Sequence, residues 1–153
     1  MYQPLSAGDL CTRNVVFAHR DMALGEAAQR MREHHVGCLV VVDDAPDGRL
    51  PVGMLTDRDI VIAVVAQDVD VRTLRVDDVM SPEPVTTREA DSLLDSLATM
   101  RRAGVRRLPV IDAHGHLQGL LTLDDVVEVI GEQMSVLAQV LVSARRREPQ
   151  HRP

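Results

Sequence analysis

Aromatic residues are nearly absent from this chain of 153 residues: they make up 1% of it, and there is no tryptophan. Tyr2 and Phe17 are the only two, so the chain cannot build the stacking platform on which proteins bind single-stranded bases. The formal net charge of -6 argues against a general nucleic-acid binder, because such a protein needs a basic face to neutralise phosphates. We therefore expect no nucleic-acid partner.

Long apolar runs and clustered cysteines are also missing. The longest apolar run, residues 60–66, is far shorter than the roughly 20 residues that cross a bilayer. Residues 1–10 lack the positive and then apolar pattern of a secretion signal. Cys11 and Cys38 stand outside any CxxC pattern, which fits reduced thiols, although a bridge between them stays open. The sequence therefore predicts a cytoplasmic protein without a membrane partner.

Patterns that carry catalysis or bind a resident metal are not found either. There is no glycine-rich phosphate loop, Ser/His/Asp order or His-Glu-x-x-His helix. The pairs His34-His35 and His114-x-His116 lack the three or four converging ligands that zinc requires. We expect surface histidines, no enzymatic activity, no metal and no required cofactor.

An internal repeat determines the expected architecture. Residues 9–43 align with residues 78–112, and after a loop shortened by three residues, residues 53–61 align with residues 119–127. The first alignment contains these identities: Asp9/Asp78, Val16/Val85, Leu24/Leu93, Met31/Met100, Arg32/Arg101, Val36/Val105, Leu39/Leu108, Val41/Val110 and Asp43/Asp112. The second alignment keeps a Gly, a Leu, a Thr and an Asp at the same spacing.

Each copy predicts the same string of elements. In the first, residues 15–17 begin a short strand, and apolar residues from Leu24 to Met31 follow at helical spacing. A β-branched strand over 38–42, a turn over 43–48, a strand over 52–55 and a helix over 57–66 complete the unit. One copy of about 60 residues has too little core to be stable alone. We therefore predict an α/β (α+β) fold of two β-α-β-β-α units packed sheet to sheet, joined by polar residues 67–78.

Three stretches of this sequence resemble a known family. They are the repeated Gly-hydrophobic-hydrophobic-Thr-x-x-Asp motif, Val-Met-Ser-Pro-Glu-Pro-Val-Thr at 79–86, and Val-Arg-Arg-Leu-Pro-Val at 105–110. The family that they resemble is the cystathionine-β-synthase (CBS) domain pair, or Bateman module. The resemblance covers roughly residues 5–135, as repeats over 5–68 and 74–135 related by a pseudo-two-fold axis. It implies an adenosine-containing ligand such as AMP, ADP, ATP or S-adenosylmethionine in the cleft between the repeats. It also implies further pairing into disc-shaped homodimers.

Thr56 and Thr122 each stand where a strand turns into a helix, a place where free backbone N–H groups favour an anion. An Asp three residues later can accept hydrogen bonds from both ribose hydroxyls. The resemblance gives this ribose role to Asp59 and Asp125, and places Thr56 and Thr122 beside ribose or phosphate. A plain helix cap explains one copy fully and is the favoured interpretation of a single copy taken in isolation. Because both copies carry the Thr-x-x-Asp motif at the same place in the repeat, a pair of nucleotide sites is favoured over two helix caps.

The two copies differ in charge, which predicts unequal sites. Arg58 in the first motif could reach a phosphate, whereas its counterpart Asp124 would repel one. Arg106 and Arg107 stand in the second copy where the first has Gly37 and Cys38. They could supply the missing positive charge or form a solvated face, and both interpretations stay open. We expect the nucleotide to bind mainly beside Arg58.

The start of each first strand also differs. Thr86 matches a Thr that the family places near the base, and its counterpart is Phe17, which would either narrow the first site or cover the adenine. The complete set of expected nucleotide-binding residues is Thr56, Arg58, Asp59, Thr122, Asp125, Thr86, Arg107, Val16, Phe17, Cys38, Leu108 and Pro109.

The C-terminal stretch predicts one long helix, from Asp124 to about Arg146. An apolar stripe runs along it: Val126, Val127, Ile130, Met134, Leu137 and Leu141. The helix could fold back on its own domain, but its length favours a homodimer interface. Arg145, Arg146 and Arg147 suit the negative end of the helix dipole, and we expect residues 148–153 to form a disordered tail.

Two functional classes remain open. The favoured one is a non-enzymatic sensor in which occupancy by an adenine nucleotide changes the packing of the repeats and a regulated protein responds. The alternative is a ligand-free interaction protein or a thiol redox sensor, in which the Thr-x-x-Asp motifs only cap helices and Cys11 or Cys38 responds to oxidation.

Overall fold

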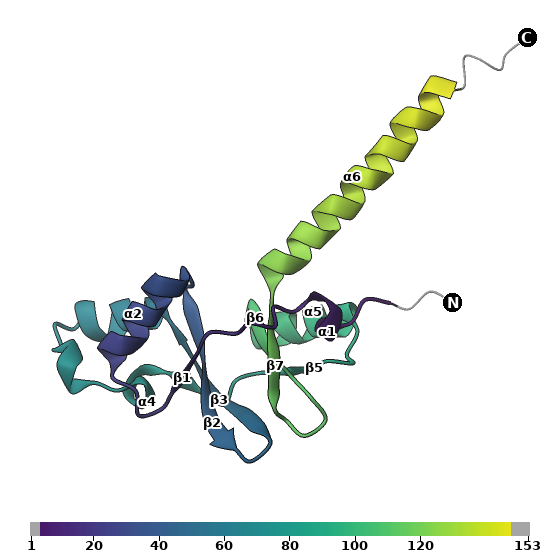
Figure 1. The fold of residues 1–153 in the computed structure, drawn as a ribbon. Helices are drawn as coiled ribbons and strands as arrows, with labels where there is room; N and C mark the ends of the chain where they lie inside the picture. Colours follow the sequence, from purple (N-terminus) through teal and green to yellow (C-terminus); the bar gives the residue numbers. More distant parts are fainter. Residues whose placement is uncertain (1–3, 148–153) are drawn as a thin grey trace, which may run out of the picture.

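Both halves of the chain contain the predicted β-α-β-β-α order in the computed structural model, which describes residues 4–147, and each is preceded by a short helix that was not predicted (Figure 1). The turn expected over residues 43–48 is shorter, because β2 continues to Ala45 and β3 begins at Gly48. The first half contains α1 (Ala7–Leu10), β1 (Phe17–His19), α2 (Leu24–His34), β2 (Cys38–Ala45), β3 (Gly48–Thr56) and α3 (Asp57–Ile60), which continues as a π-helical turn (Val61–Val65). The second half contains a 3-10 turn (Val71–Thr73), α4 (Val76–Val79), β4 (Ser81–Pro82), β5 (Thr87–Arg88), α5 (Leu93–Ala103), β6 (Arg107–Ile111), β7 (Leu117–Thr122) and α6 (Leu123–Arg147). The mixed α/β class and the duplicated unit are confirmed.

Local sequence sets the ends of the two central helices. The Ser92 hydroxyl caps α5 by accepting a hydrogen bond from the backbone N–H of Asp95 (3.1 Å). Gly104 ends α5 with a φ of 66°, in the left-handed region that glycine adopts without strain. At the matching position His35 ends α2 with a φ of 53°. The two helices therefore have the same length and end in the same way.

The opening segment of each half pairs with the sheet of the other half. One sheet has the order β1-β2-β3-β4, and its last strand, β4, comes from the second half, with Ser81 opposite Met54. The other sheet has the order β5-β6-β7, and Thr12 of the first half forms the corresponding antiparallel bridge to Leu120. The segments that precede the two first strands are thus exchanged.

The short helices α1 and α4 follow the same exchange. Ala7 of α1 is buried in the core formed by Met100, Leu108, Val110, Leu121 and Val126. Val76 of α4 is buried in the core of the first half, which consists of Ala18, Met22, Leu24, Ala27, Met31, Leu39, Val41, Leu55, Val64 and Met80. Each half therefore completes its core with apolar side chains from the other.

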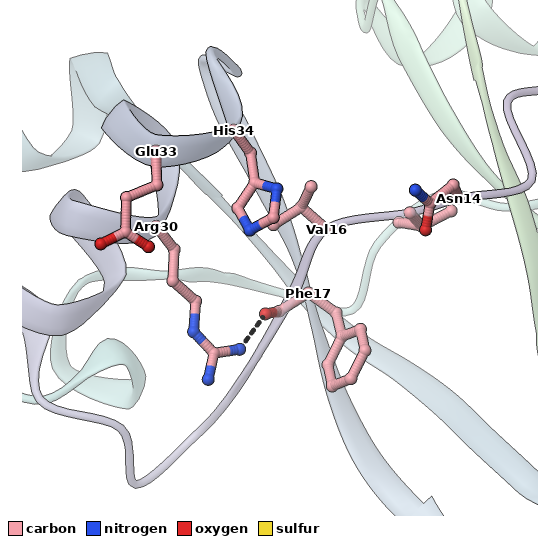
Figure 2. A pocket seen from close by; sticks show the side chains of 7 residues that line it. Asn14, Val16, Phe17, Arg30, Glu33 and His34 are labelled. Atoms are coloured by element: carbon pink, nitrogen blue, oxygen red, sulfur yellow. Dashed lines mark hydrogen bonds between the residues drawn. The ribbon is translucent and has the colours of Figure 1, made fainter.

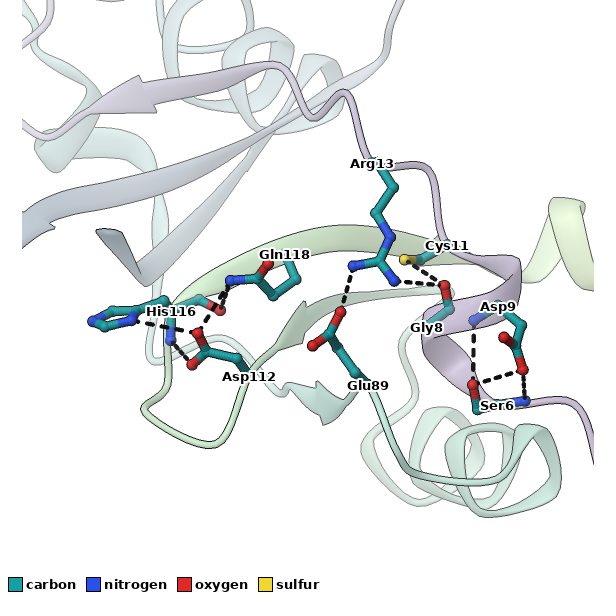
Figure 3. A network of polar contacts seen from close by, with 9 residues as sticks. All are labelled: Ser6, Gly8, Asp9, Cys11, Arg13, Glu89, Asp112, His116 and Gln118. Atoms are coloured by element: carbon teal, nitrogen blue, oxygen red, sulfur yellow. Dashed lines mark hydrogen bonds and ion pairs between the residues drawn. The ribbon is translucent and has the colours of Figure 1, made fainter. Parts of the chain in front are cut away.

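Figure 3 shows the polar contacts that fix the first opening segment against the second half. Arg13 forms an ion pair with Glu89 and donates a hydrogen bond to the carbonyl oxygen of Gly8 (2.8 Å). In the turn between β6 and β7, the Asp112 carboxylate accepts a hydrogen bond from the backbone N–H of His116 (2.9 Å). This hydrogen bond lowers the pKa of Asp112, so its negative charge stabilises the turn.

The last helix, α6, confirms the expected long C-terminal helix and projects away from both sheets (Figure 1). Of its residues only Val126 is buried. By length and composition α6 could cross a membrane, although the longest uninterrupted apolar run of the chain is short. The expectation that no segment is long enough to cross a membrane is therefore corrected. It considered only uninterrupted apolar runs, and the apolar residues of α6 are separated by polar ones. One such helix is weak evidence for a membrane. The predicted disordered tail lies outside the described residues.

Candidate functional site

Two cavities lie at equivalent places where the two halves meet. The first, called here the Thr56 cavity, has a volume of about 450 Å³ and is lined by Met54, Thr56, Asp59, Ser81, Pro82, Glu83, Pro84, Val85, Gly104, Val105, Arg106 and Arg107. The second, the Thr122 cavity, has a volume of about 350 Å³ and is lined by Thr12, Asn14, Val15, Val16, His35, Val36, Gly37, Cys38, Arg107, Leu120, Thr122, Asp124 and Asp125. Both volumes fall in the range of small-molecule sites.

The exchanged opening segments explain why each cavity contains residues from both halves. The end of β3 brings Thr56 to its cavity, and the opposite wall is the segment from Ser81 to Val85 that enters the second half. The Thr122 cavity is built in the same way from the end of β7 and the segment from Thr12 to Val16. A molecule in either cavity would contact both halves.

The glycine of each motif leaves space for this crossing. A Cβ on Gly53 would lie 2.6 Å from Met80 Sδ and 3.0 Å from the carbonyl oxygen of Ser81. A Cβ on Gly119 would meet Cys11 Sγ and lie 3.0 Å from the carbonyl oxygen of Thr12. A larger residue would displace the crossing segment and the cavity wall with it.

The Thr56 motif forms a complete helix cap. The backbone N–H of Asp59 donates to Thr56 Oγ1 (3.1 Å), and the backbone N–H of Thr56 donates to Asp59 Oδ2 (2.8 Å). These reciprocal bonds satisfy two N–H groups at the start of α3. The capping role therefore accounts for one oxygen of Asp59, while Asp59 also lines the cavity.

The Thr122 motif forms only one of the two corresponding hydrogen bonds. The backbone N–H of Asp125 donates to Thr122 Oγ1 (3.1 Å). Asp125 Oδ2 is buried and has no hydrogen-bond partner among the residues that the structure describes. A buried carboxylate oxygen without a donor is costly, by about 1–3 kcal/mol or more. Capping therefore leaves part of Asp125 unexplained.

The charges around the two cavities differ. The Thr56 cavity has Arg106 and Arg107 against Asp59 and Glu83. In the Thr122 cavity, Arg107 stands alone among the lining residues against Asp124 and Asp125. Arg106 also forms an exposed ion pair with Asp124 (Nη2 to Oδ1, 3.1 Å). The Thr56 cavity is the less acidic of the two.

Several residues expected at the site line neither of these two cavities. Arg58 is exposed and is not among the residues lining either cavity. Leu108 and Pro109 are fully buried inside β6, and Thr86 is half-buried next to Val85 without lining a cavity. The structure brings together Thr56, Asp59 and Arg107 in one cavity, and Thr122, Asp125, Val16, Cys38 and Arg107 in the other.

Phe17 lines a third cavity, which shares Asn14, Val15 and Val16 with the Thr122 cavity (Figure 2). Its carbonyl oxygen accepts a hydrogen bond from Arg30 Nη1 (3.0 Å), and Glu33 and His34 also line this cavity. The Arg49 guanidinium lies 4.2 Å from the centroid of the Phe17 ring, where a cation–π contact stabilises both groups. Phe17 does not line the Thr56 cavity, and its expected role at a nucleotide site stays a prediction.

The sequence did not point to Asn14, His35, Ser81 and Glu83 as lining residues. A signal was available, because Asn14 and Glu83 occupy the same position in the aligned copies, as do Thr12 and Ser81. However, the alignment does not reveal that each opening segment faces the motif of the other copy. Only the tertiary structure pairs them.

Within residues 4–147, no group of three or more His, Cys, Asp or Glu side chains could hold a metal ion. The pairs His34-His35 and His114-x-His116 therefore recruit no further ligands in the described part of the chain. Cys38 lies in the buried strand β2 and Cys11 is half-buried, and both are free thiols.

Comparison with known proteins identifies the family to which this architecture belongs. The family model of the CBS domain matches residues 7–66 and again residues 76–132. The chain is therefore a member of the CBS domain family, with two CBS domains in tandem.

Curated relatives are similar to this chain over most of its length. Hypoxic response protein 1 of Mycobacterium tuberculosis is 35% identical over 131 residues, which are 86% of this chain and 89% of that protein. The uncharacterised protein MK0525 of Methanopyrus kandleri is 33% identical over 125 residues, 82% of this chain. The chain spans only 62% of the length of MK0525.

Solved structures are similar over most of the chain. The crystal structure of Hypoxic Response Protein I with two coordinated zinc ions is 33% identical, with a TM-score of 0.69, over 80% of this chain and 97% of that one. CBSX2, a CBS-pair protein of Arabidopsis thaliana, in complex with AMP is 29% identical, with a TM-score of 0.70, over 84% of this chain and 98% of that one. The tandem CBS fold is confirmed.

Proposed function

We propose that this protein is a non-enzymatic regulatory module that binds an adenosine-containing ligand in the Thr56 and Thr122 cavities. The observation that carries the proposal is the buried Oδ2 of Asp125, which has no hydrogen-bond partner among the described residues and belongs to a residue that lines a cavity of adenosine-binding size. A ribose hydroxyl would donate the missing hydrogen bond. The AMP complex of CBSX2, a protein with the same fold, supports this ligand class.

Each cavity offers matching chemistry for the parts of an adenosine. Asp59 and Asp125 accept hydrogen bonds from the ribose hydroxyls, while Thr56 and Thr122 lie beside them at the same spacing. Half-buried valines supply apolar contacts for the base: Val105 in the Thr56 cavity, and Val16 and Val36 in the Thr122 cavity. The protein has almost no aromatic residue, so these aliphatic contacts replace stacking.

The two sites differ in the ligand charge that they accept. Arg106 and Arg107 favour a phosphate in the Thr56 cavity. Asp124 and Asp125 disfavour one in the Thr122 cavity, which suits an uncharged adenosine or the cationic S-adenosylmethionine. We retain the expectation of unequal sites and transfer the positive charge from Arg58 to Arg106 and Arg107.

Regulation follows from the position of both cavities between the halves. A ligand that contacts both halves binds most tightly to one arrangement of them, so binding shifts the population toward that arrangement. A regulated protein that prefers one arrangement then senses the ligand by linkage.

Calorimetric titration of the full chain with AMP and with adenosine tests the proposal. Asp59→Asn keeps an oxygen that can cap Thr56 but removes the charge, and AMP affinity should fall roughly tenfold. Asp125→Asn should weaken adenosine by a similar factor. Asp57→Asn, in the same helical turn but outside the cavity lining, is the matched control and should change either affinity less than about twofold.

The proposal fails if AMP, ADP, ATP, adenosine and S-adenosylmethionine all give neither heat nor a thermal shift. Saturation at a hundred times the dissociation constant should stabilise the fold by about 2.7 kcal/mol, which is easily detected. Wild-type affinities in both Asn variants would equally reject the assigned cavities.

A further inference from the structure

Helix α6 has a large apolar surface that nothing in the described part of the chain covers. Its large apolar residues that are at least 46% exposed are Val127, Ile130, Met134, Val136, Leu137, Val140, Leu141 and Val142. Helices in proteins derive most of their stability from packing such a face. A second molecule must therefore cover α6 for its full length to be stable in water.

The spacing of these residues indicates what kind of molecule that is. Six apolar residues alternate at intervals of three and four: Val127, Ile130, Met134, Leu137, Leu141 and Ala144. This alternation is the a/d pattern of a coiled coil, in which another helix lies along the seam. The partner of the seam is therefore a helix with a similar apolar stripe.

The charges of α6 are separated along its length. The acidic residues Asp124, Asp125, Glu128 and Glu132 occupy its first half, and Arg145, Arg146 and Arg147 occupy its end. Residues 133–144 between them carry no Asp, Glu, Lys or Arg. Parallel pairing of two copies would bring like charges together at both ends, whereas antiparallel pairing brings each acidic end to a basic one.

We propose that α6 pairs in antiparallel orientation with α6 of a second copy of this chain. One register satisfies the whole seam: Val127 lies opposite Ala144, Ile130 opposite Leu141, and Met134 opposite Leu137. The same register brings the acidic first turn of one helix level with Arg145, Arg146 and Arg147 of the other. The seam is thus complementary to itself about a two-fold axis between Met134 and Leu137.

A membrane is a poorer partner for the same helix. The uncharged stretch of α6, residues 133–144, spans roughly 18 Å at the helical rise, well short of the hydrocarbon core of about 30 Å. Glu128 and Glu132 would lie inside the bilayer if the helix were centred to span it. Ser135, Gln139 and Ser143 lie on the face opposite the seam, so polar side chains interrupt the apolar surface that a lipid-facing helix would need on every side.

Sedimentation equilibrium of the full chain across the micromolar range tests the pairing. We expect the mass of two chains for the wild type and for Val142→Glu. Leu137→Glu should shift the mass to one chain. Val142 is 51% exposed and Leu137 is 59% exposed. The two variants therefore place a charge at similarly exposed apolar positions, of which only Leu137 lies on the seam.

A single-chain wild type, a paired Leu137→Glu variant or equal dissociation of both variants would overturn the proposal. So would flotation of a single-chain wild type with phosphatidylglycerol vesicles. Orientation is tested in a chain with Cys11→Ser and Cys38→Ala. Mixing its Val127→Cys and Ala144→Cys forms should give a disulfide-linked pair after oxidation, and rapid cross-linking of the Ala144→Cys form alone would overturn the antiparallel arrangement.

Discussion

The aspartates of the two motifs have the same sequence position but different hydrogen bonds. Asp59 donates its N–H to Thr56 and accepts from it in return, while Asp125 has a buried oxygen free of any partner among the described residues. A residue that only caps a helix has no need of a buried, unsatisfied oxygen. At the residue scale, Asp125 is therefore the strongest indication of a ligand.

The position of the arginines predicts which one senses a phosphate. Arg107 lines both cavities, whereas Arg58 is exposed outside them. Arg107→Ala should weaken AMP binding by roughly tenfold or more, since a hydrogen bond to a charged group contributes about 1.5–3 kcal/mol. Arg58→Ala should have less than about a twofold effect, and calorimetry measures both. A larger loss in Arg58→Ala would show that the phosphate lies outside the Thr56 cavity.

The two thiols are poorly suited to fast redox sensing. Burial raises the pKa of the Cys38 thiol, although Arg107 opposes the shift, and burial likewise raises the pKa of Cys11. A raised pKa leaves less reactive thiolate at neutral pH. In single-cysteine variants, both thiols should react with an aromatic disulfide reagent more slowly than glutathione does, and Cys38 most slowly. A thiol faster than glutathione would instead support the redox alternative.

At the scale of elements, the crossing of the opening segments decides the architecture of both cavities. Sequence periodicity correctly predicted α2, β2, β3, α5 and the long α6, because each has a clear apolar pattern or cap. It missed α1 and α4, which have only four residues each. Their shared signal was the repeated Asp9/Asp78, which accepts a hydrogen bond from the backbone N–H of Ser6 or Arg75.

The motif glycines test the crossing directly. Gly53→Ala and Gly119→Ala should each destabilise the fold by about 1–3 kcal/mol, because the added methyl group overlaps the crossing segment. Gly25→Ala in α2 meets no atom within 4 Å and should be neutral or stabilise by up to about 1 kcal/mol through helix propensity. Urea unfolding of the three variants measures the difference. Equal stability of all three would contradict the close approach.

At the scale of the whole molecule, the two cavities lie apart from all of α6 except its first turn. The residues of α6 that line a ligand cavity, Asp124 and Asp125, lie in its first turn, and the helix then leaves the two sheets (Figure 1). Assembly and ligand binding can therefore be separated by truncation.

A chain ending at residue 132 should keep both cores and bind AMP with unchanged affinity. Its thermal midpoint should no longer depend on protein concentration, because mass action links the midpoint to assembly only while the subunits pair. Scanning calorimetry at two concentrations a hundredfold apart measures this. A concentration-dependent midpoint in the truncated chain would place the contact between subunits on the CBS domains instead.

The sequence by itself determined the repeated unit, the order of most elements and the Thr-x-x-Asp motifs, because these depend on periodicity and on residues close together in the chain. Only the tertiary structure decided which segments meet. It placed Ser81 to Val85 beside Thr56, since the opening segments cross between halves, and it left Phe17 and Arg58 outside the lining of the Thr56 cavity. Contacts of that kind join residues distant in sequence, and no local pattern records them. The duplicated unit can thus be recognised from the sequence, whereas the cavities between its two copies form only when the chain folds.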